Sequence, residues 1–390
     1  MPLSTAPVRE QALLELRAEF PILETSTYLI SNSLGAMPRA VRDSLAGYAD
    51  GWAAHGVRCW EGDWSTSPDR VAASIAQIIG AAAGTVSMHQ NVTLASAVVA
   101  SCFDFAGPRN GVVCSELNFP SIVHLYRAQE RRGARVTLVP SADGFTVPTE
   151  ALLEAIDETT LLVPLSHVIF RSSFVQDIEA IVERAHEVGA LVVLDVYQSA
   201  GIVPVEVAAL GVDFAVGGTL KWLCGGPGVA YLYASPAMIE RVEPALTGWF
   251  ARENPFAFDP RDESYRDDAW RFASGTPNIP ALSAARPGAE LLASLDLAAV
   301  RAKSQRQTQL LIEACIEQGW QVNSPLDAGI RGGHVTVDMP GAESVAGQLL
   351  ERRVMIDYRP GAGIRMAPHF YTLDEELFAA VEAIREITGG

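Results

Sequence analysis

Several features that would assign the chain to a particular class are missing from its sequence. No window approaches the roughly 20 uninterrupted apolar residues that a membrane-spanning helix needs. The N-terminal stretch has no cationic start followed by an apolar run, so we expect no export signal. The five cysteines are scattered, with no CxxC pair and no metal-like Cys/His spacing, which is typical of reduced thiols. We therefore expect a cytoplasmic protein with no membrane partner and no bound metal.

Basic residues are also in deficit. The chain has 29 Lys and Arg against 46 Asp and Glu, a formal net charge of −17. A polyanion of this size repels nucleic acid and anionic lipid at long range, so neither is an expected partner. Apolar residues nevertheless make up 49% of the 390 residues, which is enough for a sizeable core and for two domains.

From about residue 111 onward, short apolar runs alternate with amphipathic stretches. A helix is predicted to begin after Asp177, its N-cap, and to stop at Gly189, and the apolar run 191–195 follows at once. Strands that carry no apolar/polar alternation are buried on both faces, which indicates a parallel sheet between helices. The alternation of strands and helices predicts an α/β fold.

The composition changes near residues 253–280, a stretch rich in proline, aspartate and aromatic residues. Its composition indicates a long ordered excursion, after which helical and strand patterns resume as a second, smaller α/β unit. We assign residues 1–45 to an N-terminal arm that forms part of the small domain. Residues 46–275 form the large domain, and residues 276–390 form the small C-terminal domain.

Two side chains carry the clearest chemical signal. Asp195 ends a buried strand at its carboxyl edge, where open α/β sheets bind their ligands. Lys221 comes 26 residues later (221 − 195), just past a second apolar strand and before the glycine turn 224–228. A carboxylate and a lysine aimed into one crevice suit pyridoxal 5′-phosphate (PLP): the lysine forms a Schiff base, and the carboxylate keeps the pyridine nitrogen protonated. The alternative is a strand-end aspartate and a surface lysine that never meet.

A third signal lies where an apolar helix begins near residue 92. Gln90, Asn91 and Thr93 sit at this start, where free backbone N–H groups and the helix dipole favour a phosphate dianion. Ordinary N-capping is the alternative interpretation, because Asn and Thr are preferred cap residues.

Short segments along nearly the whole chain resemble one family, the fold type I PLP enzymes of the class V aminotransferase type, and specifically kynureninases. This resemblance implies a large PLP-binding domain, with a mostly parallel seven-stranded sheet between helices, plus the smaller C-terminal α/β domain. The matching segments are YLISNSLGAMP at 28–38, NFP at 118–120, SHVIFR at 166–171, LTGWF at 246–250, RFASGTPN at 271–278, GIRMAPHFY at 363–371 and the stretch 195–228.

The resemblance also implies roles for individual residues. Phe119 would stack on the cofactor, Gln198 and Thr219 would contact it, and Thr276 would reach the phosphate in the partner subunit of a homodimer with shared active sites. Phe119 as an ordinary core residue is the alternative. The implied substrate-binding residues are Asn32, Ser33, Trp249 and Arg365. The planar guanidinium group of Arg365 suits an α-carboxylate. The alternative for Arg365 is a surface ion pair, which is the commoner environment of an arginine.

Five positions depart from the kynureninase pattern. Gln198 replaces a histidine and cannot carry a proton, and Leu220 replaces a tyrosine whose hydroxyl serves the phosphate and proton transfer. Ile122 and Phe170 make the pocket less polar, and Arg252 stands where histidine is usual. We expect cofactor binding to survive these changes and activity on kynurenine itself to be weak.

The predicted function is a PLP-dependent enzyme that acts on an L-amino acid by kynureninase-like cleavage at the β-carbon of a β-substituted alanine. A C–S or other β-lyase, or a class V aminotransferase, is the alternative on the same scaffold. A persulfide-forming desulfurase is disfavoured because Cys315 lies in a helical stretch and no cysteine occupies 330–333. Retention of Lys221 argues against a catalytically idle PLP-fold protein.

Overall fold

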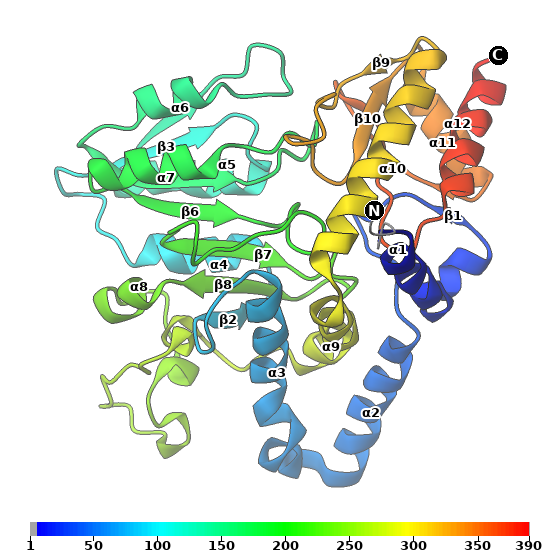
Figure 1. Ribbon diagram of the computed structural model, residues 1–390. Coiled ribbons are helices and arrows are strands. Elements are labelled where there is room, and N and C mark those ends of the chain that lie inside the picture. Colours follow the sequence, from blue (N-terminus) through cyan, green and yellow to red (C-terminus); the bar gives the residue numbers. More distant parts are fainter. Residues whose placement is uncertain (1–5, 390) are drawn as a thin grey trace, which may run out of the picture.

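A seven-stranded sheet forms the centre of the larger part of the molecule (Figure 1). The computed structural model describes residues 6–389. The strand order is β2-β8-β7-β6-β5-β3-β4, and β8 runs antiparallel to β2 and β7 while the other neighbours pair in parallel. This confirms the predicted mostly parallel sheet of the α/β fold. The strands are β2 (Val86–His89), β3 (Gly111–Ser115), β4 (Arg135–Val139), β5 (Thr160–Ser166), β6 (Leu191–Asp195), β7 (Phe214–Gly218) and β8 (Ala230–Ala234).

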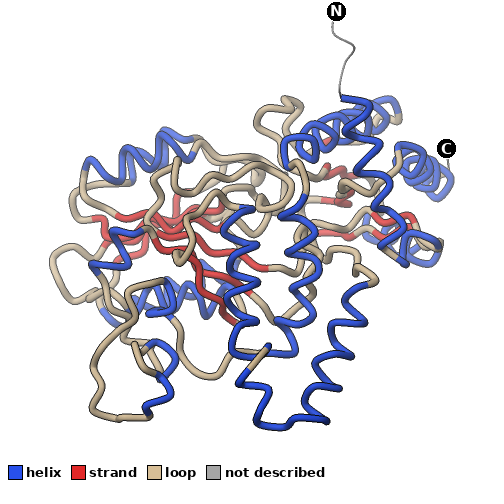
Figure 2. Tube along the Cα trace, turned by 60° about the horizontal axis from the view of Figure 1, so that its bottom comes forward, coloured by secondary structure: helices blue, strands red, loops and turns tan. Residues whose placement is uncertain are grey.

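Helices cover both faces of this sheet, as Figure 2 shows. One core cluster joins the sheet to α3, α6, α7 and α9, and a second joins its other face to α4, α5 and α8. A further helix, α2, packs against α3 and α9. Their bounds are α2 (Ala40–His55), α3 (Asp63–Ile78), α4 (Val92–Ser101), α5 (Pro120–Ala128), α6 (Thr149–Ala155), α7 (Ile178–Glu187), α8 (Pro236–Arg241) and α9 (Ile279–Ser294).

The smaller part of the molecule has its own sheet and core. Its four strands are ordered β12-β13-β10-β9, and a separate parallel pair, β1 and β11, ties the N-terminal arm to it. Leu29 of this arm lies in the same core cluster as α10, α11 and α12. The elements are β1 (Thr27–Tyr28), β9 (Gln321–Val322), β10 (Val335–Asp338), β11 (Val354–Met355), β12 (Asp357–Arg359), β13 (Gly363–Met366), α1 (Ala6–Glu15), α10 (Leu297–Glu317), α11 (Ala342–Glu351) and α12 (Asp374–Thr388).

Local sequence explains where helix α7 begins and ends and why the buried strand β6 follows it. Asp177 caps α7 by accepting a hydrogen bond from the Ala180 N–H at 3.3 Å, and Gly189 takes a left-handed φ of 76° that stops the helix. The chain then enters β6, whose five residues are all buried. Both predictions for this segment are confirmed.

The predicted excursion at residues 253–280 contains no strand; only short 3₁₀ turns and the start of α9 interrupt it.

Within residues 6–389, no helix is both long and apolar enough to cross a membrane. The 3₁₀ helices of the described chain are η1 (Leu16–Glu19), η2 (Pro21–Glu24), η3 (Gly56–Glu61), η4 (Gln129–Arg132), η5 (Trp249–Ala251), η6 (Pro255–Ala257) and η7 (Ala269–Phe272).

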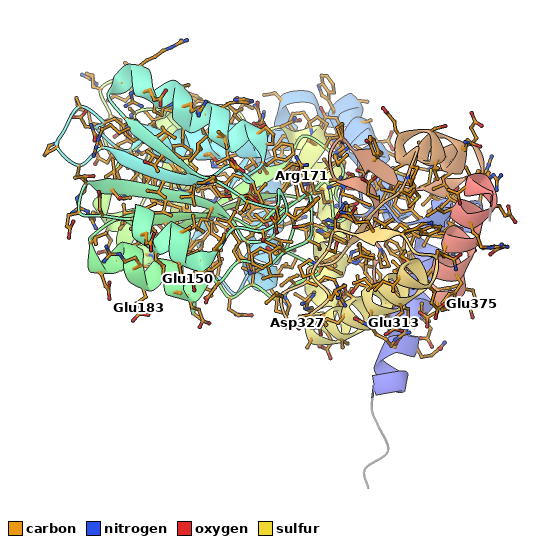
Figure 3. All side chains as sticks on the ribbon, turned by 90° about the horizontal axis from the view of Figure 1, so that it is seen from above. Glu150, Arg171, Glu183, Glu313, Asp327 and Glu375 are labelled. Atoms are coloured by element: carbon orange, nitrogen blue, oxygen red, sulfur yellow. The ribbon has the colours of Figure 1, made fainter. Side chains whose placement is uncertain are left out.

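The carboxyl ends of β5, β6 and β7 point toward the small part of the molecule. Arg171, labelled in Figure 3, comes shortly after β5 and donates to the carbonyl oxygen of Gly361 at 2.6 Å, across the junction. Thr336 of β10 donates in return to the carbonyl oxygen of Arg171 at 2.8 Å. Side chains at these strand ends therefore lie between the two parts, where a ligand can contact both.

Candidate active site

A cavity of about 170 Å³ opens at the carboxyl edge of the central sheet. Ser166 at the end of β5 and Asp195 at the end of β6 line it, together with the start of α4 and the segment that follows β7. Six of the residues predicted for cofactor binding lie together in its wall: Asn91, Thr93, Phe119, Asp195, Gln198 and Lys221.

Asp195 is a buried carboxylate held by the backbone that follows it. Its Oδ1 accepts a hydrogen bond from the Tyr197 N–H at 2.9 Å, and its side chain makes no ion pair with any residue of the described range 6–389. Burial raises the pKa of Asp195, and the Tyr197 N–H and the nearby Lys221 only partly oppose this. A protonated nitrogen of a ligand would give this carboxylate the direct ion-pair partner that it does not have among residues 6–389.

Lys221 faces the same cavity and is only 8% exposed. Burial lowers the pKa of its amine to about 7, against the pull of Asp195 and with the repulsion of Arg365 and Arg359. A large share of the amine is therefore neutral near pH 7, which is the form that attacks an aldehyde.

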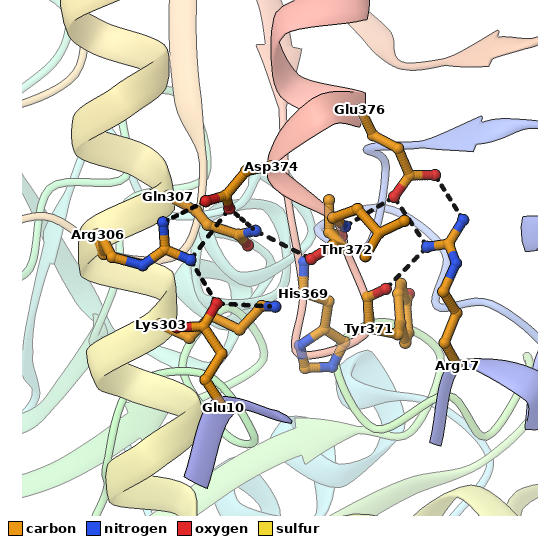
Figure 4. Close-up of polar contacts among 11 residues, drawn as sticks. Glu10, Arg17, Lys303, Arg306, Gln307, His369, Tyr371, Thr372, Asp374 and Glu376 are labelled. Carbon is orange, nitrogen blue, oxygen red and sulfur yellow. Dashed lines mark hydrogen bonds and ion pairs between the residues drawn. The ribbon is translucent and has the colours of Figure 1, made fainter. Parts of the chain in front are cut away.

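Only one other lysine, Lys303, could react with an aldehyde, because the sequence contains just these two lysines. That residue is 3% exposed on α10 and pairs with Glu10 at 3.3 Å (Figure 4). Glu10 also pairs with Arg306 in this cluster of the small part of the molecule. Lys303 is thus held away from the cavity, and Lys221 is the lysine available to a ligand there.

The start of α4 supplies anion-binding groups. Asn91 caps the helix, as its Oδ1 accepts from the Leu94 N–H at 2.9 Å, so the capping interpretation holds for this side chain. The cap still leaves the N–H groups of Val92 and Thr93 without partners inside the helix, since the first turn has no preceding carbonyl groups. Both residues line the cavity, so an anion there would meet free N–H groups and the positive end of the helix dipole.

Two aromatic residues, Phe119 and Phe170, line the cavity, and the Phe119 ring is exposed to it. Phe119 is 45% exposed, and its ring packs edge-on against Phe170 with centroids 5.3 Å apart. Ile122 and Val168 complete an apolar wall. The alternative that Phe119 is an ordinary core residue is wrong, and its ring is free to contact a flat ligand.

Arg365 lies behind Phe170 in a buried polar cluster. Its Nε donates to Asp357 Oδ1 at 2.7 Å, its Nη2 donates to Asp357 Oδ2 at 2.5 Å and to Ser33 Oγ at 2.9 Å, and its Nη1 donates to the Phe170 carbonyl at 2.7 Å. The Nε–Nη2 edge, one of the two-pronged edges with which Arg365 could hold a substrate carboxylate, is thus occupied by Asp357. One N–H of Nη1 remains, and at 1% exposure Arg365 is a buried ion pair instead of a surface one.

Asn32 and Gln198 connect this cluster to the cavity. Gln198 Nε2 donates to the Asn32 carbonyl at 3.0 Å, and Gln198 Oε1 accepts from Trp222 Nε1 at 3.2 Å. The Asn32 side chain is fully buried, and neither of its amide atoms has a partner among the described residues. An unsatisfied buried amide beside the cavity is a polar group that a ligand or an ordered water would complete.

Four of the predicted site residues do not line this cavity. Gln90 and Thr276 line a neighbouring cavity of about 180 Å³ on another side of the start of α4. The buried Thr219 hydroxyl donates to the carbonyls of Gly226, in the glycine turn, and of Val229, just after it, and Thr219 does not line the cavity. Trp249 stacks on Phe258 in a surface hollow, with ring centroids 5.7 Å apart.

Sequence reasoning missed several residues at the site. Tyr197 lines the cavity beside Lys221, and Asp357 and Arg359 complete the Arg365 cluster, where Arg359 Nη2 lies 3.0 Å from Asp357 Oδ2. His334 is fully buried near the same charges, and neither ring nitrogen has a partner in the described chain. A signal for Asp357 was present, because 357–365 has the pattern of two short strands around a Pro-Gly turn.

Comparison with known proteins points to one family. The model of the family described as aminotransferase class V matches residues 27–367. An uncharacterized aminotransferase, YcbU, of Bacillus subtilis is 33% identical over 95% of this chain and 96% of its own length. A kynureninase of Pseudomonas fluorescens is 32% identical over 97% of this chain and 93% of its own length. Among solved structures, a C-DES variant with glycine covalently linked to its PLP cofactor covers 94% of this chain and 98% of its own, with a TM-score of 0.85 at 19% identity.

The residues present fit pyridoxal phosphate, which is the cofactor of this chain. The fit rests on an amine with a lowered pKa, a buried carboxylate with no ion-pair partner in the described chain, a free helix N-terminus and an exposed aromatic ring around one cavity. These are the groups that the aldehyde, the pyridine nitrogen, the phosphate and the ring of the cofactor require.

Proposed function

The chain belongs to the aminotransferase class V family of PLP enzymes, and within that family we propose that it cleaves a β-substituted L-alanine at its β-carbon. This proposal is kynureninase-like in reaction type, and it takes the preferred substrate to be an amino acid other than kynurenine. The observation that carries it is the placement of Lys221 and Asp195 in one cavity that adjoins the Arg365 cluster. An amino acid needs both a proton-accepting amine and a carboxylate site.

The residues that would hold the cofactor are those of the cavity wall. Lys221 would bind it covalently, Asp195 would pair with its pyridine nitrogen, the start of α4 would hold its phosphate, and Phe119 would cover its ring. When bound, PLP supplies a ring that accepts the electron pair released when a bond to the substrate's Cα breaks.

Lys221 is the base that this arrangement offers for the substrate's Cα proton. Its buried position keeps water away, and its lowered pKa leaves the amine free to accept a proton near neutral pH. In the second half of the reaction the same Nζ is placed to return a proton, because it remains in the cavity wall.

The α-carboxylate would bind at the Arg365 cluster. Arg365 and Arg359 face a single carboxylate, Asp357, so these three groups carry a net charge of +1. One N–H of Arg365, and those N–H groups of the part-exposed Arg359 that are not used by Asp357, Ser33 and the Tyr358 carbonyl, could donate to a substrate carboxylate. We propose that both arginines, and not Arg365 alone, neutralise that group.

The cavity wall disfavours kynurenine itself. Ile122 and Phe170 present apolar surface, and the Gln198 amide is already engaged by Asn32 and Trp222 and cannot transfer a proton. A β-substituent that leaves without protonation by an acid at position 198 suits this wall better.

Incubation of the holoenzyme with a panel of β-substituted L-alanines, followed by mass spectrometry of the products, tests the proposal. We expect alanine or pyruvate from at least one of them, and a kcat/KM on kynurenine below the ~10⁴ M⁻¹s⁻¹ at which enzymes handle their own substrates. The variant Lys221→Ala is the inactive control, and Lys303→Arg is the matched control that keeps activity. Conversion that depends on an added 2-oxo acid would instead establish an aminotransferase, the activity named for YcbU.

We also propose a homodimer in the cytoplasm, with Thr276 and Trp249 of one subunit near the cavity of the other. Both residues lie away from their own cavity, on or beside the excursion at residues 253–280, where Phe256 and Phe258 are 53% and 71% exposed.

The domain boundaries near residues 45 and 275 remain predictions, and the first five residues of the N-terminal arm lie outside the described chain.

A further inference from the structure

A pair of glycines at the end of β7 makes room for tyrosine rings. A Cβ at Gly218 would lie 1.9 Å from Cε2 and 2.6 Å from the hydroxyl oxygen of Tyr197, and a Cβ at Gly217 would meet Tyr231 in the same way. Neither glycine has a positive φ, so neither is required for backbone conformation. Glycine weakens a strand, and its use here therefore indicates a need for space.

The ring that occupies this space lies directly against Lys221. Lys221 Nζ is 4.3 Å from the centroid of the Tyr197 ring and 5.7 Å from that of Phe119. Both distances are within the ~6 Å reach of a cation–π interaction. The Tyr197 hydroxyl forms no hydrogen bond within residues 6–389, so the ring face is the part of this side chain that contacts the amine.

The amine has few other partners when it is protonated. It lies in a buried site that disfavours its charge, and two arginines oppose the charge further. Asp195 is the group that most favours the protonated amine, but we have assigned its carboxylate to the pyridine nitrogen. The charged or titratable groups that act on Lys221 are Asp195, Asp357, Arg359, Arg365 and His334.

We propose that the Tyr197 ring is the surface on which the protonated Lys221 amine rests, and that Gly218 exists to admit this ring. Tyr197 is thus a positioning residue for proton transfer. When the Cα–H bond breaks, its electron pair would remain at Cα, where the bound cofactor's ring would draw it in, and the proton would go to the lone pair of Nζ. The ring then stabilises the ammonium group through its π face without a covalent change. The catalytic meaning rests on the proposed function, whereas the contact itself does not.

The test titrates the Lys221 amine in full-length protein that has been freed of cofactor. The protein is labelled with an amine-acylating reagent from pH 5 to pH 10, and labelling of each lysine is followed by peptide mass spectrometry. Because the chain has only two lysines, Lys303 serves as an internal standard. We expect Tyr197→Leu to lower the pKa of Lys221 by about one unit, a tenfold change or ~1.4 kcal/mol. Tyr197→Phe keeps the ring and should leave this pKa within about 0.3 units of wild type.

A second variant covers the possibility that Tyr197→Leu does not fold. Gly218→Ala displaces the ring without altering Tyr197 and should lower the Lys221 pKa in the same direction. Equal titration in wild type, Tyr197→Leu and Gly218→Ala would overturn the proposal. So would a fall in Tyr197→Phe as large as that in Tyr197→Leu, since the hydroxyl and not the ring would then act on the amine. Neither measurement uses a substrate, so a failure of the proposed β-cleavage leaves this result unaffected.

Discussion

The buried amine of Lys221 should make the cofactor-free protein less stable than a variant without it. In the folded chain the pKa of this lysine falls from the ordinary 10.5 to about 7 because burial disfavours its charge. Below pH 7 the lysine is protonated in both the folded and the unfolded state, and the whole cost of burying the charge is present. Between about pH 7 and the ordinary lysine pKa of 10.5 only the unfolded state holds the proton, so the free energy of unfolding rises with pH.

The size of the effect follows from the same pKa. A fall from 10.5 to about 7 corresponds to roughly 5 kcal/mol, which is a ceiling for the gain when the charge is removed. Lys221→Met keeps a side chain of similar length but removes the positive charge that partly neutralises Asp195, so the gain should fall below this ceiling. We therefore expect ~2–4 kcal/mol of added stability at pH 6. The gain should shrink steadily as the pH is raised toward 10.

Thermal unfolding of cofactor-free protein, measured at several pH values, provides the assay. Lys303→Met is the matched control: burial also lowers the pKa of this lysine, but Glu10 and Asp374 oppose the shift, so its gain in stability at pH 6 should be smaller than that of Lys221→Met. A Lys221→Met protein that melts below wild type at pH 6, or one whose difference from wild type does not change with pH, would refute the reasoning.

Three further predictions concern the holoenzyme. Asp195→Asn should retain part of its cofactor but lose most of its turnover, because an amide cannot hold the pyridinium charge; near wild-type kcat would place the carboxylate partner elsewhere. Arg365→Lys should raise KM sharply and leave the absorption spectrum of the bound cofactor intact, since lysine cannot keep both Asp357 and a substrate carboxylate, a difference of ~1.5–3 kcal/mol; an unchanged KM would assign the carboxylate to another group. Sedimentation should show a homodimer, and a fully active monomer would contradict the shared active site.

Much of the fold followed from the sequence because its central strands carry an unambiguous pattern. Strands buried on both faces have no alternation, and β3, β6, β7 and β8 are buried at every residue. Asp195 and Lys221 could be paired in advance because Asp195 ends one such strand and Lys221 follows another, and the carboxyl ends of neighbouring parallel strands meet at one edge of a sheet.

The polar cluster was harder to foresee because its members come from distant parts of the chain. Ser33, from the N-terminal arm, bonds Arg365 across 332 positions, and no local pattern records that contact. Asp357 was accessible in principle, since it is the cross-strand partner of Arg365 in a hairpin. Its charge changes the role of the arginine, because an arginine that is already paired offers a substrate one N–H instead of a fork.

The same cluster explains why an amino acid suits the site better than a simple amine. Around Lys221 the structure gathers two arginines, Arg359 and Arg365, against the carboxylates Asp195 and Asp357. With Asp195 assigned to the pyridine nitrogen in our proposal, one arginine would have no counter-charge until a ligand brings a carboxylate. A carboxylate bound there would offset the repulsion that the arginines exert on Lys221, and it would thereby favour the ammonium form that Lys221 reaches on taking a proton from Cα. In this proposal, substrate binding and proton transfer would be coupled through one set of buried charges.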